Sequence, residues 1–140
     1  MENIMDIKIV DKQYKLNPYN NLRYYLEITL SDYVDNLWQE SYQAALHSNG
    51  LDSITSLRIS DAPVVNKIQF AGNKIITPDF PEFAKNDVPE FIHELEKIIA
   101  LANAIYRSKQ KLAHQKKELE EMKQQEQIKK LEEMNKDLNS

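Results

Sequence analysis

Residues 22–30 read Leu-Arg-Tyr-Tyr-Leu-Glu-Ile-Thr-Leu, and this stretch decides the fold class. Its even-numbered positions, from Leu22 to Leu30, are apolar or aromatic. Its odd-numbered positions include Arg23, Glu27 and Thr29. Because successive side chains of a strand point to opposite faces, the alternation predicts a strand with one buried face and one solvated face.

Shorter stretches on both sides show the same alternation. Residues 4–9 predict a strand before it, and residues 15–21, which are rich in Asn and contain Pro, predict a loop between the two. After it, Gly72-Asn73 is a two-residue hairpin signal. Further strands are expected over residues 57–60, 64–70 and 74–77, with residues 61–63 as an interruption.

A helix is expected between the second and third strands. Ser31 is a possible cap, and Asp32 and Asp35 then fall in the first turn, where the helix dipole favours negative charge. Asn49-Gly50 would end the helix, because glycine readily takes the left-handed conformation found there. One face would carry apolar or small side chains, namely Val34, Leu37, Trp38, Ser41, Ala44 and Ala45.

The last third of the chain predicts one very long helix. Residues 78–86 form a linker with two prolines and two phenylalanines, and Asp87, Pro89 and Glu90 then make a favourable helix start. No Gly or Pro follows Pro89, so residues 88–138 would form a rod of roughly 75 Å at 1.5 Å per residue. We expect an α+β head over residues 1–87, a head-packed helical part over 88–106 and a charged helical tail or coiled coil over 107–140.

Together these elements predict an α+β fold with an antiparallel sheet of about five strands, in the order β-β-α-β-β-β-α. One helix covers a face of the sheet, and the long C-terminal helix extends as a coiled coil.

The coiled-coil expectation comes from apolar residues repeating every seven positions, with a break over residues 124–127 and a new phase after it. The alternative is a solvated single helix held by Glu–Lys pairs four residues apart, each worth ~0.2–0.5 kcal/mol. We expect helix association through Ile98, Ile105, Leu112, Leu119, Met122, Leu131, Met134 and Leu138.

Composition narrows the functional classes. The chain has no cysteine, which excludes disulfides and thiolate chemistry, and no apolar run approaches the ~18–20 residues of a membrane span. Residues 1–106 hold 9 Lys and Arg against 15 Asp and Glu, a net charge of −6, whereas residues 107–140 hold 9 against 7, a net of +2. We therefore expect a cytoplasmic protein that binds neither nucleic acid nor a membrane.

Candidate chemical sites are few. Glu90 and His93 stand three residues apart, as in carboxylate-bridged metal sites, but those sites need a second such pair. We expect no catalytic residues, no metal and no cofactor. Arg23 and Tyr25 on the second strand, with Tyr42 on the first helix, form a possible binding surface, and an ordinary solvated sheet face is the alternative.

The sequence therefore favours a non-catalytic protein-binding or assembly protein. The head would recognise a protein partner, and the C-terminal helix would associate with that partner or with a second copy of the chain. The alternative is a small-ligand-binding or inhibitory protein with a pocket between the sheet and the helices, an interpretation favoured by 7 tyrosines in 140 residues.

Overall fold

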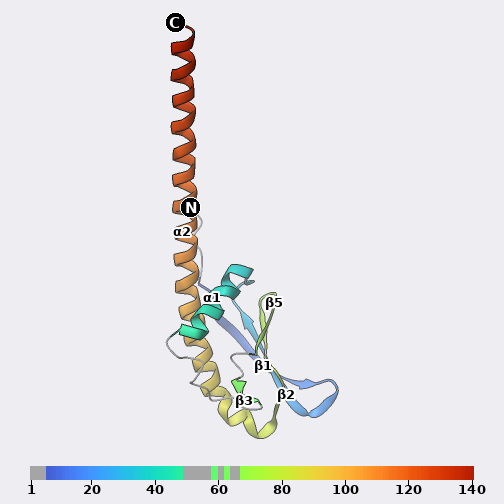
Figure 1. The fold of residues 1–140 in the computed structure, drawn as a ribbon. Helices are drawn as coiled ribbons and strands as arrows, with labels where there is room; N and C mark the ends of the chain where they lie inside the picture. Colours follow the sequence, from blue (N-terminus) through green and yellow to red (C-terminus); the bar gives the residue numbers. More distant parts are fainter. Residues whose placement is uncertain (1–5, 49–57, 60–61, 64–66) are drawn as a thin grey trace. The chain divides into compact units, whose positions relative to one another are not determined.

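The computed structural model describes residues 6–48, 58–59, 62–63 and 67–140, and all structural statements concern these residues. The chain divides into an N-terminal unit, Met1–Tyr106, and a C-terminal unit, Arg107–Ser140. The elements, drawn in Figure 1, are β1 (Ile9–Asn17), β2 (Asn20–Leu30), α1 (Asn36–His47), β3 (Arg58–Ile59), β4 (Ala62–Pro63), β5 (Gln69–Ala71), β6 (Lys74–Ile76), β7 (Phe80–Pro81), the 3-10 helix η3 (Glu82–Asp87) and α2 (Val88–Leu138).

β2 is the central strand of the main sheet. It pairs with β1 on one side and with β6 and β7 on the other, all antiparallel, and β5 lies beyond β6. The expected alternation is confirmed, because Leu26, Ile28 and Leu30 are buried while Glu27 and Thr29 are partly exposed. The expectation is wrong for Leu22, which lies near the hairpin turn and is 76% exposed.

The first strand lies later in the chain than its local pattern indicates. β1 begins at Ile9 and runs to Asn17, through the first three of the seven residues expected to form a loop. Only Pro18 and Tyr19 turn the chain. The Asn17 side-chain oxygen accepts hydrogen bonds from the backbone N–H groups of Tyr19 (2.7 Å) and Asn20 (3.2 Å), so the asparagine holds the turn rather than interrupting the strand.

The segment after β6 is not the expected linker. Its β7 part pairs with β2, and Phe80 is fully buried there, whereas Phe83 is 80% exposed. Between β6 and β7, the Thr77 hydroxyl accepts a hydrogen bond from Leu26 N–H (2.8 Å) and Thr77 N–H donates to Leu26 C=O (3.1 Å). A side chain thus replaces one backbone partner, and the chain follows β2 across an irregularity that sequence patterns do not indicate.

The hairpin signal at Gly72-Asn73 is confirmed. β5 and β6 pair on either side of it, and Gly72 has φ 63°, the left-handed conformation that glycine tolerates. The expected interruption over residues 61–63 is wrong where the structure describes it, because β4 pairs with β3 there in a separate two-stranded sheet. The rest of that region, including the expected helix end at residues 49–50, lies outside the described residues.

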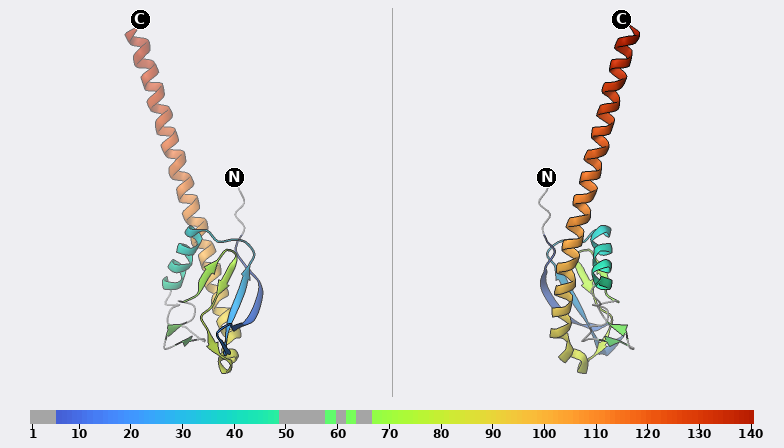
Figure 2. Two further views of the ribbon diagram at one scale, coloured as in Figure 1. Left: turned by 90° about the vertical axis from the view of Figure 1, so that its right-hand side faces the viewer. Right: turned by 60° about the vertical axis from the view of Figure 1, so that its left-hand side comes forward.

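α1 and the part of α2 that belongs to the N-terminal unit lie on the same face of the sheet (Figure 2). α1 begins at Asn36 rather than near Ser31, because the Asp35 carboxylate accepts a hydrogen bond from Trp38 N–H (2.8 Å) and caps the helix. Trp38 and Tyr42 stack on each other, and both meet Phe70 of β5 edge-on. The core therefore lies between one sheet face and both helices.

α2 begins at Val88, as the sequence predicts, and spans 51 residues. Its first turns contribute large buried side chains, among them Phe91, Leu95 and Ile98, to the core. The α+β class, the antiparallel sheet of about five strands and the long C-terminal helix are all confirmed.

Candidate functional site

The C-terminal unit exposes an unusual number of large apolar side chains. Every residue from Lys111 to Ser140 is exposed. Isolated exposed leucines are ordinary, whereas contiguous rows of large exposed apolar side chains are rare on monomeric proteins. The seven side chains are Leu112 (65% exposed), Leu119 (52%), Met122 (59%), Ile128 (57%), Leu131 (57%), Met134 (64%) and Leu138 (81%).

These side chains form two stripes on the helix. At about 100° per residue, the members of each stripe gather on one face, and the two faces lie about a third of a turn apart. The change of face falls over residues 123–127, which are Lys-Gln-Gln-Glu-Gln. The proximal stripe is Leu112, Leu119 and Met122, and the distal stripe is Ile128, Leu131, Met134 and Leu138.

The predicted association surface therefore needs correction at its N-terminal end. Ile98 is 1% exposed and lies in the core of the N-terminal unit, and Ile105 packs partly buried against that core. Their seven-residue spacing to Leu112 arises because a helix packed on a sheet presents the same period as a helix in a coiled coil. Ile128 was missed, although it stands three residues before Leu131.

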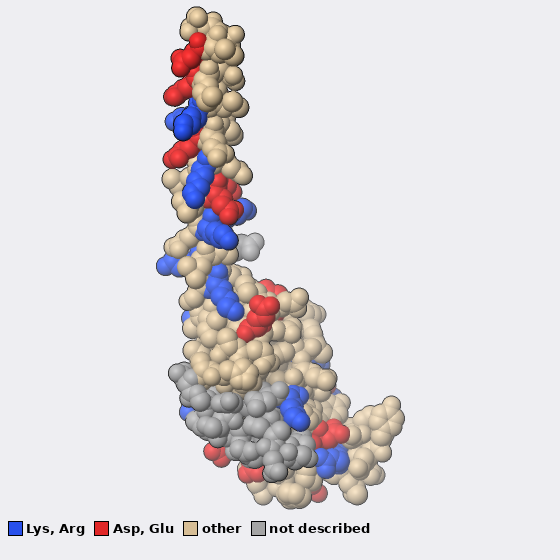
Figure 3. Space-filling model, in the orientation of Figure 1, with Lys and Arg blue, Asp and Glu red and all other residues tan. Residues whose placement is uncertain are grey.

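Charged side chains occupy other positions of the C-terminal unit. Figure 3 shows Lys, Arg, Asp and Glu gathered along one side of its visible face, with uncharged surface beside them. In the described structure His114 and Glu118 are close, with Nε2 and Oε1 2.9 Å apart. Such exposed i,i+4 pairs contribute little stability, so they do not account for the apolar stripes.

A second candidate site is a groove in the N-terminal unit. Its volume is about 440 Å³, and it lies between β1 and the first turns of α2. Four lining residues are exposed and three are buried, so the groove is open along one side. The lining residues are Lys12, Gln13, Tyr14, Leu26, Val88, Pro89 and Ile92.

Apolar surface continues from this groove toward the β1–β2 hairpin. Tyr14 and Leu16 lie opposite Leu26 and Tyr24, on the face of the sheet that carries the helices, yet they are 51% and 54% exposed. Residues 16–22 carry no charge, and the hairpin they form extends past the other strands of the sheet (Figure 1).

The binding surface expected from Arg23, Tyr25 and Tyr42 is wrong, because the three do not share a surface. Tyr42 is fully buried in the core, and burial raises the pKa of its hydroxyl. Arg23 and Tyr25 belong to the opposite face of the sheet, where Arg23 Nη2 donates to Asp79 C=O (3.0 Å). Tyr42 was misplaced because Phe70, which covers it, is distant in sequence.

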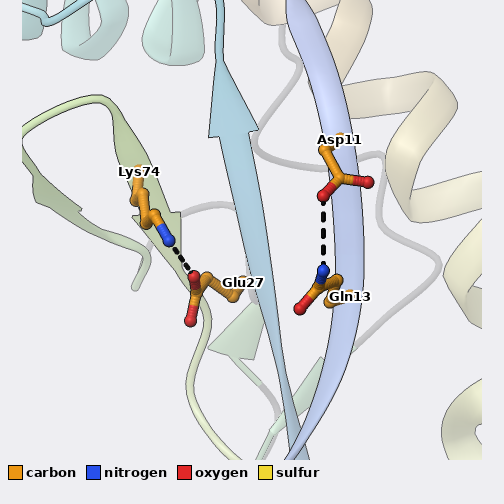
Figure 4. Close-up of polar contacts among 4 residues, drawn as sticks. All are labelled: Asp11, Gln13, Glu27 and Lys74. Atoms are coloured by element: carbon orange, nitrogen blue, oxygen red, sulfur yellow. Dashed lines mark hydrogen bonds and ion pairs between the residues drawn. The ribbon is translucent and has the colours of Figure 1, made fainter.

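The face of the sheet opposite the helices carries ordinary polar pairs. Gln13 donates to Asp11 (3.4 Å), and Lys74 pairs with Glu27 (Figure 4). The hydrogen bond from Lys74 lowers the pKa of Glu27 and raises the pKa of Lys74. These contacts satisfy the side chains locally and leave no converging set of reactive groups among these four residues.

Within the described residues, no three His, Cys, Asp or Glu side chains are grouped so that they could hold a metal ion. The same residues include no helix with the length and apolar content that a membrane crossing requires. Comparison of the chain with protein-family models, with curated proteins and with solved structures found no match.

Proposed function

We propose that the chain is an assembly protein whose C-terminal unit associates with the same unit of further copies. One observation carries the proposal: seven large apolar side chains are more than half exposed along residues 112–138. A second copy is the natural partner because it brings an identical, automatically matched set of stripes.

The size of the stripes indicates that both are needed. Full burial of a large apolar side chain stabilises by about 1.5–3 kcal/mol, so covering a half-exposed one contributes about 1 kcal/mol. Because the stripes lie on different faces, an assembly that covers both gives each copy a neighbour on each face. Fourteen side chains are then covered for every two copies, about 14 kcal/mol, against an association cost of about 4–15 kcal/mol. The proximal stripe alone would contribute about 6 kcal/mol and the distal stripe alone about 8 kcal/mol of this gain, so loss of either stripe should strongly weaken association.

Sedimentation equilibrium of the full chain tests the proposal, with one glutamate placed on each face. Leu119→Glu disrupts the proximal stripe and Leu131→Glu the distal stripe. Gln125→Glu is the matched control, because it adds the same charge on the side of the helix away from both stripes. Leucine and glutamate have similar helix propensities, so the helix itself should persist.

We expect the wild-type chain to sediment well above its monomer mass of 16.4 kDa. Each stripe variant should need at least about tenfold higher concentration to associate, equivalent to 1.4 kcal/mol, while the control stays within about twofold. A wild-type chain that remains at 16.4 kDa at millimolar concentration would remove the proposal. Equal behaviour of all three variants would also contradict it.

The small-ligand alternative stays a prediction. Its place would be the groove beside β1, which combines apolar walls with Lys12 and Gln13. Ligand sites enclose most of the surface of a small molecule, and this groove is open along one side. The expected cytoplasmic location likewise remains a prediction from the sequence.

A further inference from the structure

The free edge of β1 is the starting observation. β1 has nine residues and forms one edge of the main sheet, and among the described strands it pairs with β2 alone. An edge strand presents a row of backbone N–H and C=O groups that another extended chain can pair with. Proteins commonly protect such edges by making them short, but β1 is the second longest strand described.

The groove lies at this same edge. Three consecutive β1 residues, Lys12 to Tyr14, form one wall, and Val88, Pro89 and Ile92 of α2 form the other. A groove between an edge strand and a helix is the geometry in which peptides add as an extra strand, with alternate side chains entering the groove. Tyr14 and Leu16, both on the groove face, would flank apolar side chains of such a peptide.

Charge indicates what kind of segment fits. Residues 8–17 hold Lys8, Lys12 and Lys15 against Asp11, a net charge of +2, within an N-terminal unit of net charge −6. Lys8 and Lys12 are exposed and Lys15 is half-buried. The edge is therefore a basic strip on an acidic unit, which favours an acidic partner segment and repels a basic one.

We propose that β1 accepts an extended segment of a partner protein, rich in alternating apolar and acidic residues, as an added antiparallel or parallel strand. The apolar side chains enter the groove between β1 and α2, on the face that carries Lys12 and Tyr14, and the carboxylates lie on the other face of the strand, beside Lys15. This interaction is independent of the C-terminal stripes and would give the assembled protein a recognition site on each copy.

The test uses the ¹⁵N-labelled full chain and a blocked ten-residue peptide of alternating valine and glutamate. We expect chemical-shift changes confined to β1 and the groove walls, together with slower amide hydrogen exchange along β1. The matched peptide of alternating valine and lysine should bind at least about tenfold more weakly. A valine–glutamate peptide with alternate backbone nitrogens methylated should not bind, because it has lost the donors on one edge.

Protein variants locate the site. Lys15→Glu should weaken binding of the valine–glutamate peptide by about fivefold or more, because it turns an attraction into a repulsion on the face where the carboxylates lie. Lys67→Glu is the control, since it places the same charge change beyond the opposite edge of the sheet, before β5. Circular dichroism melting checks that both variants remain folded.

Three outcomes would overturn the inference: shift changes away from β1, equal binding of the acidic and basic peptides, or no shift change at millimolar peptide. In the last case the edge lysines serve only to discourage aggregation. None of these results bears on self-association through the C-terminal unit, which sedimentation measures separately.

Discussion

Replacing Asn103 with leucine should destabilise the N-terminal unit by removing a buried polar junction. Asn103 lies on α2 and is 6% exposed. Its side-chain oxygen accepts hydrogen bonds from Ile7 N–H (3.1 Å) and from the Trp38 indole N–H (2.9 Å), and its amide nitrogen donates to Ile7 C=O (2.9 Å). One side chain thus ties the segment before β1, α1 and α2 together.

The magnitude follows from the three groups left without partners. Each buried unsatisfied group costs about 1–3 kcal/mol, and the added leucine methyl groups recover part of that loss. We expect a net loss of about 3–4 kcal/mol in the free energy of unfolding. For a unit of this size that corresponds to a fall in Tm of about 12–16 °C.

Trp38 provides the assay, because it is the only tryptophan of the chain and is 2% exposed. Its fluorescence during urea unfolding reports on the N-terminal unit. Asn86→Leu, the same substitution at an exposed position of the N-terminal unit, is the control and should change the free energy of unfolding by less than about 0.5 kcal/mol. A loss below about 1 kcal/mol for Asn103→Leu would refute the reasoning.

Three further predictions concern a turn, a tyrosine and an ion pair. Gly72→Ala should cost about 1–2 kcal/mol in thermal unfolding, because φ is 63° at this position. The pKa of Tyr106 is raised to about 12 by burial and by its hydrogen bond to Asp35, so ultraviolet titration should show, besides the buried Tyr42, a late-ionising tyrosine that Asp35→Asn moves back toward its ordinary value. Because the folded pKa is raised, this group's contribution to stability is complete below pH ~10 and is lost as pH rises toward 12. Lys74→Met should raise the lowered pKa of Glu27, which carbon-detected NMR titration measures, and should remove the part of the acid sensitivity that arises as pH falls through that pKa.

How far the candidate sites could be predicted depends on whether their signal is local. The proximal and distal stripes were largely predicted from the sequence, because apolar residues on a helix keep their spacing wherever the helix lies. The groove beside β1 was not, since its walls are more than seventy residues apart, at Lys12 and Val88. Tyr42 was assigned to a surface because the period of α1 alone does not show that Phe70 covers its outer edge.

The sequence by itself determined the classes of element: the alternating strand over residues 22–30, the glycine hairpin at Gly72 and the helix that begins at Val88. These depend on side-chain period, on φ and on capping, which act over a few residues. Only the tertiary structure decided that β1 starts at Ile9 and that Phe80 pairs beside β2. Those features depend on which distant backbone groups can form hydrogen bonds and which distant apolar side chains can be buried together. No local pattern contains that information.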